Sequence, residues 1–184
     1  MSGVLLEDSL FRPAGQIDSH VPDTFGVYVI RLADGVTLPE PFETLRWSRQ
    51  SRLIYIGKAT SLKKRMLGNE LRGRGHGSFF RSIGAVLGHR PPTGSLASRA
   101  NKYDYIFQKQ DRDAIVEWIN TSLEVNWAVL PQADVRTTEA MLILDHTPLL
   151  NLDGNPRALV ELDELRVLCR TIASGTAPVN ASRR

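Results

Sequence analysis

The chain has 184 residues, of which 42% are hydrophobic and 23% charged, so it is long enough for one domain with a buried core. No apolar run approaches the roughly 20 residues of a membrane-spanning helix, and the N-terminus lacks the features of a secretory signal. The single cysteine, Cys169, cannot form an internal disulfide and has no zinc-binding pattern with the four histidines. We therefore expect a cytoplasmic protein without a membrane partner.

The net charge of +3 is unevenly distributed along the chain. Between Lys58 and Lys102, ten Lys or Arg residues accompany one acid, Glu70, whereas residues 1–50 carry four basic and seven acidic side chains. A segment with a net charge of +9 suggests a surface for a polyanion such as a nucleic acid. A solvated basic face without a partner explains the same counts.

The first half of the chain contains two runs typical of strands. Residues 1–23 are expected to form an irregular lead-in. Apolar runs rich in β-branched and aromatic residues then predict strands at about 25–31 and 52–57, paired antiparallel. The segment between them is too long for a tight hairpin, so we expect an inserted loop with a helical turn at Phe42–Trp47.

Helical patterns dominate the rest of the chain. Ser61 is placed to cap a helix at 62–71, and a glycine-rich loop separates this helix from a second at Ser78–Leu87. The next expected elements are a short strand at Tyr103–Phe107, a helix from Asp111 or Asp113 to about Thr121, and a half-buried strand at Leu123–Leu130. A helix at about 134–145 follows, with Met141, Leu142 and Leu144 turned inward. The C-terminal tail at 153–184 is expected to contain a helix at 158–172 and a disordered end over the last dozen residues.

Five short motifs follow one another along these elements. Gly26-Val27-Tyr28 and Tyr55-Ile56-Gly57-Lys58 lie in the two predicted strands, and Leu62-Lys63-Lys64-Arg65 follows one helical turn later. Glu139 lies on a later helix, and Pro148-Leu149-Leu150-Asn151 ends the series. In this order, over roughly residues 24–152, the motifs resemble the GIY-YIG nuclease superfamily.

The resemblance implies an α/β (α+β) fold with a small central three-stranded antiparallel sheet and helices on both faces. The alternation of short strands and helices agrees with this fold class. The chain then divides into a lead-in at 1–23, a nuclease-like domain at 24–152 and the tail at 153–184. The implied activity is metal-dependent endonucleolytic cleavage of DNA, expected on duplex DNA. With one active site per chain, a double-strand break would need a homodimer or two cleavage events.

By the same resemblance, Tyr28 is the general base on the attacking water and Tyr55 orients it. Arg65 binds the phosphate, and Glu139 is the only direct protein ligand of one Mg²⁺ or Mn²⁺ ion. Asn151 either holds the site together or touches the phosphate. A phenol has a pKa near 10, so a tyrosine base needs a nearby cation, which Lys58 or Arg65 could supply. We expect Tyr28, Tyr55, Arg65, Glu139 and Asn151 to converge on one pocket.

Two further expectations concern the basic segment. Many family members carry a histidine four residues after the arginine, where this chain has Asn69, and His76 could replace it as a proton donor or phosphate contact. Substrate phosphates are expected to contact six basic residues: Lys58, Lys63, Lys64, Arg72, Arg74 and Arg81.

Each of these residues also has a non-catalytic explanation. The tyrosines could pack in the core, Arg65 could be part of a solvated face, and Glu139 could be a helix carboxylate favoured by the helix dipole. The chain as a whole could be a non-catalytic nucleic-acid-binding module on the same fold, or a structural domain with a chance match. The biological role, whether restriction, repair, homing or phage-related, stays open.

Overall fold

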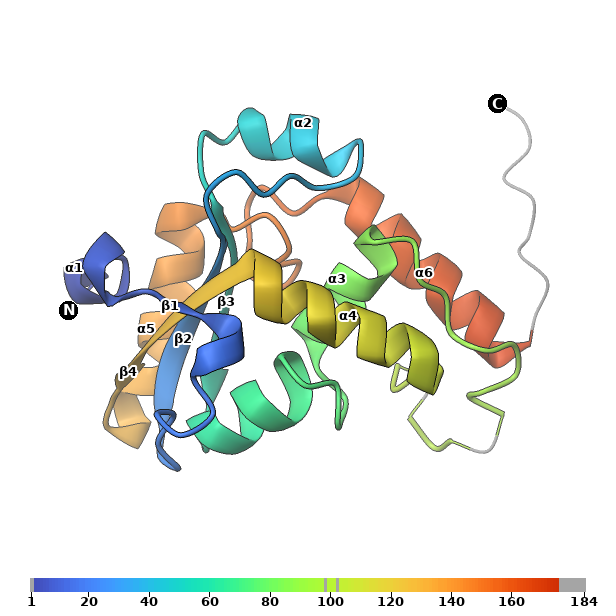
Figure 1. Ribbon diagram of the computed structural model, residues 1–184, viewed down its shortest axis with the longest axis horizontal. Coiled ribbons are helices and arrows are strands. Elements are labelled where there is room, and N and C mark those ends of the chain that lie inside the picture. Colours follow the sequence, from blue (N-terminus) through green and yellow to red (C-terminus); the bar gives the residue numbers. More distant parts are fainter. Residues whose placement is uncertain (1, 98, 102, 176–184) are drawn as a thin grey trace.

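The two tyrosine motifs lie on neighbouring antiparallel strands, β2 (Gly26–Leu32) and β3 (Leu53–Ala59). They belong to a four-stranded antiparallel sheet in the computed structural model, which describes residues 2–97, 99–101 and 103–175 (Figure 1). The strand order is β1-β4-β2-β3, where β1 is Arg12–Pro13 and β4 is Leu123–Val129. The fold class is confirmed; the sheet has one strand more than expected because the two residues of β1 pair with β4.

Strand register decides which side chains share a face of the sheet. Tyr28 lies opposite Gly57, and Tyr55 lies opposite Ile30. Side chains alternate between faces along a strand. The face that carries Tyr28 and Tyr55 is covered by η3 (Lys63–Glu70), α3 (Ser78–Val86), α4 (Lys109–Ser122) and α6 (Val160–Ser174), and it holds the larger core cluster.

The opposite face of the sheet is covered by α5 (Gln132–His146) and by α1 (Ser2–Leu5) (Figure 1). Val27, Val29 and Ile56 pack there against Leu142 and Ile143 of α5. Met141 and Leu144 do not turn inward as expected, since their exposed fractions are 57% and 59%. The inner stripe of α5 instead passes through Val135, Leu142 and Ile143.

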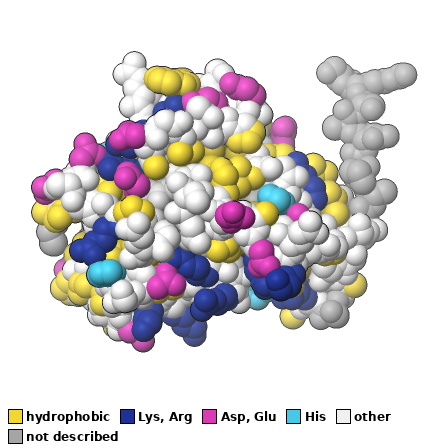
Figure 2. Space-filling model, in the orientation of Figure 1, with side chains coloured by type: hydrophobic (Ala, Val, Ile, Leu, Met, Phe, Trp, Pro, Cys, Tyr) yellow, Lys and Arg dark blue, Asp and Glu magenta, His cyan; other side chains and the backbone are white. Residues whose placement is uncertain are grey.

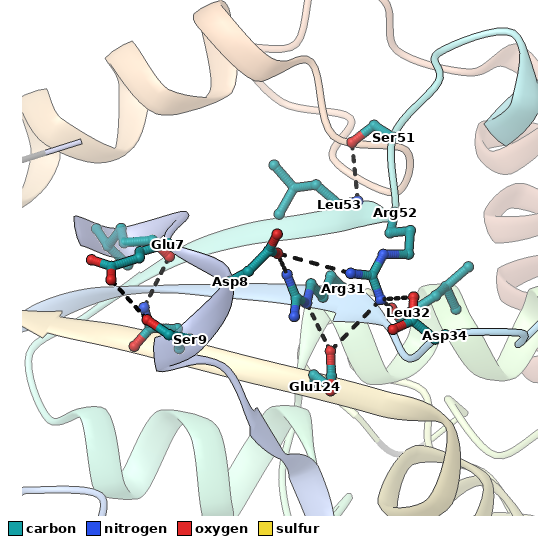
Figure 3. Close-up of polar contacts among 12 residues, drawn as sticks. Glu7, Asp8, Ser9, Arg31, Leu32, Asp34, Ser51, Arg52, Leu53 and Glu124 are labelled. Atoms are coloured by element: carbon teal, nitrogen blue, oxygen red, sulfur yellow. Dashed lines mark hydrogen bonds and ion pairs between the residues drawn. The ribbon is translucent and has the colours of Figure 1, made fainter. Parts of the chain in front are cut away.

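The N-terminal residues are tied to the sheet by packing and by ion pairs. Short 3₁₀ turns, η1 (Asp8–Leu10) and η2 (Ala14–Gln16), flank β1. Arg31 of β2 pairs with Asp8 and, at 2.8 Å, with Glu124 of β4, while Arg52 pairs with Asp34 at 2.7 Å (Figure 3). The lead-in is therefore fixed to the sheet at Arg31, one residue beyond the Ile30–Tyr55 pair.

Three other sequence expectations can be compared with the structure. The turn at Phe42–Trp47 is present as α2. The strand expected at Tyr103–Phe107 is wrong: this segment is irregular, and its buried Tyr105 and Phe107 pack as an edge-to-face pair instead of joining the sheet. Most of the end predicted to lack order, 176–184, lies outside the described residues.

Within the described residues, every helix is too short or too polar to span a bilayer.

Candidate active site

Gly57 provides the space that Tyr28 occupies. The Tyr28 side chain is buried, and a Cβ built on Gly57 would lie only 2.4 Å from its hydroxyl oxygen. Any side chain at position 57 would therefore displace the phenol. The Tyr28 and Tyr55 rings lie 6.3 Å apart between centroids, so the paired strands bring the two motif tyrosines together as expected.

Arg65 lies on a helix of unusual register. The segment expected as an α-helix at 62–71 is a π-helix, η3, in which the Leu71 amide donates to the Met66 carbonyl five residues earlier. Ser61 caps its start as expected, because its Oγ accepts a hydrogen bond from the Lys64 amide at 3.0 Å. π-Helical turns are rare and occur mostly at functional sites.

This register brings Glu70 onto the same side of the helix as Arg65. In an α-helix, residues five apart point about 140° away from each other. Here the Arg65 guanidinium contacts the Glu70 carboxylate at 2.8 Å. Glu70 was not among the site residues expected from the motifs, although it is the one acid among the basic residues between Lys58 and Lys102.

The Glu70 carboxylate is fully buried and has partners on both oxygens. Oε2 accepts hydrogen bonds from the amides of Phe79, at 2.9 Å, and Phe80, at 3.3 Å, at the start of α3. Oε1 accepts a long hydrogen bond of 3.5 Å from the Tyr28 hydroxyl. A Cβ on Gly77 would lie 2.4 Å from Oε2, so the glycine loop lets the chain pass close to the carboxylate.

Glu139 reaches the same region from the opposite face of the sheet. It lies in the middle of α5, on the inner stripe, with only 15% of its side chain exposed, and it forms an ion pair with Lys58 of β3. A mid-helix position gives little interaction with the helix dipole, which acts within the terminal turns. Because β3 is an edge strand, side chains from both faces can meet around it.

Asn151 covers the open edge of β3. Its side-chain amide donates to the Ile56 carbonyl and its oxygen accepts from the Ile56 amide, both at 2.9 Å. The Leu150 amide adds a bond of 2.8 Å to the Ile54 carbonyl. Asn155 in turn donates to the Pro148 and Asn151 carbonyls. This geometry favours the holding role over direct phosphate contact, since the Asn151 amide already pairs with the backbone.

These elements enclose one large cleft of about 1060 Å³. Tyr55, Lys58, Arg65, Glu139 and Asn151 line it. Tyr28 does not line it and lies directly beneath Gly57, which does. Six Lys or Arg side chains line the cleft against three acids: Lys58, Lys64, Arg65, Arg136, Arg166 and Arg170 against Glu139, Asp153 and Asp163.

Several expected substrate contacts lie elsewhere. Arg72 pairs with Asp18 and donates to the Ala14 carbonyl at 2.8 Å, and together with Arg74 it borders a separate hollow beside α4. Arg81 is buried and bound to Asp104 and the Tyr103 carbonyl. Lys63 is exposed outside the cleft lining. The Lys and Arg side chains that gather along the lower part of Figure 2 are interspersed with acidic ones.

The glycine loop also holds His76 away from the cleft. His76 is exposed and outside the cleft lining, whereas Asn69 lines it. A Cβ on Gly75 would lie 2.2 Å from the Asn69 side-chain oxygen, so the loop packs on Asn69 through its glycines. In this arrangement His76 does not take the place of the family histidine.

The cleft cations that sequence reasoning missed lie mainly on α6. Arg166 donates to the Ser82 hydroxyl at 2.8 Å and the Ser78 carbonyl at 3.2 Å, which anchors it beside α3. Its Nε is buried without a hydrogen-bond partner, as is the Nε of Arg65. Leucines at helical spacing predicted an amphipathic helix at 158–172, but nothing in that pattern placed its arginines against the cleft.

Burial shapes the electrostatics of the two tyrosines. Desolvation raises the pKa of Tyr28 well above its ordinary value, and the Glu70 carboxylate raises it further, while Arg65 opposes the rise. Desolvation and Glu70 likewise raise the pKa of Tyr55. Burial also raises the pKa of Glu70, against the opposing effects of Arg65 and the amides of α3. Both phenols are therefore protonated at neutral pH.

The donor set fits a hydrated magnesium ion better than a fully protein-bound metal. Among residues 2–97, 99–101 and 103–175, no three His, Cys, Asp or Glu side chains are grouped to hold a metal. Mg²⁺ retains several waters and is often bound through one or two carboxylates and substrate phosphates. The Glu139 carboxylate in the cleft meets this requirement, with Lys58 as the cation that pairs with it.

The structure is a four-stranded antiparallel α+β domain with a basic cleft beside its edge strand. The chain belongs to the GIY-YIG catalytic domain family, whose model matches residues 26–168. It is a nuclease-type domain of a family that generally depends on a divalent metal ion. The match includes most of α6. Searches of curated proteins and of solved structures returned no match.

Proposed function

We propose that this domain is a metal-dependent endonuclease that hydrolyses phosphodiester bonds in DNA. The observation that carries the proposal is the single cleft in which Arg65, Tyr55 and the Lys58–Glu139 pair face one another. Hydrolysis requires an activated water and stabilisation of charge on the phosphate oxygens. The cleft supplies cations and a carboxylate for both requirements.

Arg65 is the residue assigned to the scissile phosphate. Glu70 fixes one side of its guanidinium, and its Nε is buried without a partner. A planar guanidinium held in this way can donate to two phosphate oxygens. Burial lowers and Glu70 raises the pKa of Arg65, with a net rise, so the residue carries its positive charge at every pH of interest.

Tyr28 is assigned as the general base and Tyr55 as the residue that orients the water. Tyr28 is fully buried, and its hydroxyl donates to the Glu70 carboxylate, which also pairs with Arg65 of the cleft lining. When Arg65 turns toward a substrate phosphate, the Tyr28 hydroxyl beneath Gly57 becomes the group that faces the cleft. The burial of Tyr28 in the free domain is also the observation that favours the alternative function, a non-catalytic nucleic-acid-binding module.

Glu139 is assigned as the protein ligand of one divalent ion, Mg²⁺ or Mn²⁺. When bound, such an ion stabilises the negative charge that develops on the leaving oxygen. Lys58 neutralises Glu139 in the free domain and is released to bind a phosphate when the carboxylate is engaged. Asn151 keeps β3, and with it Tyr55 and Gly57, in place.

The proposed substrate is duplex DNA, bound through its phosphates by Lys58, Lys64, Arg136, Arg166 and Arg170. Lys and Arg contacts to phosphates fix the position of the duplex and carry no sequence information directly, so these side chains would contribute affinity more than sequence specificity. One cleft per chain cuts one strand, and a double-strand break requires a second copy or a second event. A homodimer and a cytoplasmic location remain part of this proposal.

Plasmid cleavage with the Glu139→Ala variant tests the assignment. Supercoiled plasmid is incubated with Mg²⁺ or Mn²⁺, with and without chelator. The variant should fold and bind DNA, but its cleavage rate should fall at least about 100-fold, in the range expected for loss of a key charge-stabilising group. Asp145→Ala, an exposed acid on the same helix, is the matched control and should cleave as the wild type does.

Two outcomes would contradict the proposal. Cleavage by Glu139→Ala at the wild-type rate would remove Glu139 from the site. Tight DNA binding by the wild type without cleavage under any divalent metal would favour the non-catalytic module.

A further inference from the structure

Glu70 has the least accessible carboxylate of the site, and the nuclease assignment leaves it without a chemical role. It has no exposed surface, and its partners are Arg65 and Tyr28 of the site and the amides of α3. Burying an ionised carboxylate is unfavourable unless charged or hydrogen-bonded partners compensate for the lost water. A buried acid of this kind, shared by two site residues, is a candidate for a chemical function.

Local backbone geometry is adapted to this carboxylate. The π-register of η3 turns Glu70 toward Arg65, and Gly77 leaves the space that Oε2 occupies. Gly57 leaves the space for the Tyr28 hydroxyl. The π-register and two glycines thus surround the Tyr28–Glu70 pair: the register places Glu70, Gly77 borders its Oε2, and Gly57 borders the Tyr28 hydroxyl.

The hydrogen bond also sets a direction for proton movement. The Tyr28 hydroxyl donates its proton to Glu70 Oε1, at 3.5 Å. An oxygen that donates its only proton in one direction can act only as an acceptor in the others. The Tyr28 oxygen therefore keeps its lone pairs for other donors, and Gly57 is the residue that separates this buried oxygen from the cleft.

We propose that Glu70 is the positioning residue and final proton acceptor of a relay from water through Tyr28. This inference rests on the proposed nuclease function. The attacking water forms its bond to phosphorus and gives one proton to the Tyr28 oxygen. Tyr28 gives its own proton to Glu70 Oε1, so the phenol is neutral before and after and the carboxylate becomes a carboxylic acid. The P–O bond to the leaving oxygen breaks, and that oxygen keeps the electron pair and departs as an alkoxide.

The relay accounts for a difficulty in using Tyr28 as a base. A phenol whose ionisation is disfavoured by burial cannot supply much phenolate at neutral pH. With the proton passed on, no free phenolate has to form. The charged or titratable groups that face Glu70 are Arg65 of η3, Tyr28 of β2 and, at longer range, Tyr55 of β3; α3 faces it with backbone amides.

The test is the pH dependence of single-turnover cleavage in Glu70→Gln, which keeps the size of the side chain and removes its charge. In the wild type, the rate should rise with pH as Glu70 loses its proton and then level off. In Glu70→Gln, the rate at neutral pH should fall about 10²–10⁴-fold, as expected for loss of a proton acceptor, and should keep rising into the alkaline range.

Glu43→Gln is the matched control, because Glu43 also forms a largely buried pair with an arginine, Arg46 of α2, outside the cleft. It should lower thermal stability and leave the pH profile of cleavage unchanged. A Glu70→Gln profile with the wild-type shape, only scaled down, would show that Glu70 is structural and would overturn the relay.

A second measurement uses the unaltered protein, in case Glu70→Gln does not fold. The single-turnover rate is measured in mixtures of H₂O and D₂O. Two protons in motion predict a curved dependence on the deuterium fraction, whereas a straight line would overturn the relay. The two failures can be told apart. A wild type that binds DNA but does not cleave it would refute the nuclease function, whereas cleavage whose rate depends linearly on the deuterium fraction would refute only the relay.

Discussion

The side chain of Asn151 offers a direct measure of how firmly the edge of β3 is held. Asn151→Ala removes two hydrogen bonds of 2.9 Å, one to the amide and one to the carbonyl of buried Ile56. Each buried backbone group left without a partner costs about 1–3 kcal/mol. Partial entry of water from the adjacent cleft reduces this loss, so we expect a total of about 2–4 kcal/mol.

For a protein of this size, that loss corresponds to a fall in melting temperature of roughly 5–15 °C. Thermal unfolding followed by circular dichroism measures it. Asp153→Ala, two residues away and exposed, is the control and should shift the melting temperature by no more than a surface substitution does. Asn151→Asp retains the acceptor for the Ile56 amide but turns a carboxylate oxygen toward the Ile56 carbonyl, so it should be destabilising as well.

An Asn151→Ala variant with the melting temperature of the wild type would show that Asn151 does not hold the edge of β3. If that variant also lost DNA cleavage, Asn151 would have to act on the substrate and not on the strand. A large loss of stability, with cleavage retained well below the melting temperature, would establish the holding role.

Two further predictions concern charge. The Lys64→Ala/Arg166→Ala double variant should make the plot of log affinity against log salt less steep by about two units, since each phosphate contact contributes roughly 0.9. The Arg72→Ala/Arg74→Ala double variant should leave the steepness unchanged, because those arginines border a different hollow. Equal effects of the two double variants would contradict the assignment of the cleft as the DNA-binding surface. The second prediction concerns stability at alkaline pH, because burial raises the pKa values of Tyr28, Tyr55 and Tyr105 in the folded protein. Above pH of about 10 the unfolded chain loses phenol protons that the folded chain keeps, so the urea midpoint should fall as pH rises past that point, and a midpoint independent of pH there would contradict it.

Hydrophobic periodicity predicted most of the fold because most elements bury one regular stripe. The runs around Tyr28 and Tyr55, and the alternation at Leu123–Leu130, correspond to β2, β3 and β4. The same rule failed at Tyr103–Phe107, where alternate residues are buried under helices and no neighbouring strand is available. Periodicity reports burial, and burial against a helix can imitate burial in a sheet.

The candidate site was predictable only where it follows motif order. Tyr55, Lys58, Arg65, Glu139 and Asn151 were named from their motifs, and the cleft brings them together. Glu70 was missed because α-helical spacing separates it from Arg65, and Arg166 because it depends on how α6 packs on α3. Counting charges in the basic segment also overstated its role, since Arg72 and Arg81 are bound to acids of neighbouring segments.

The register of η3 makes this helix sensitive to changes in chain length. Hydrogen bonds that close five residues back accommodate one residue more per turn than the α-helical pattern does. Deleting a single residue between Arg65 and Glu70, such as Gly68, would allow the segment to relax into an ordinary α-helix. Such a deletion would place the arginine and the glutamate four residues apart, a spacing that keeps both on one face of an α-helix, whereas an insertion would separate them.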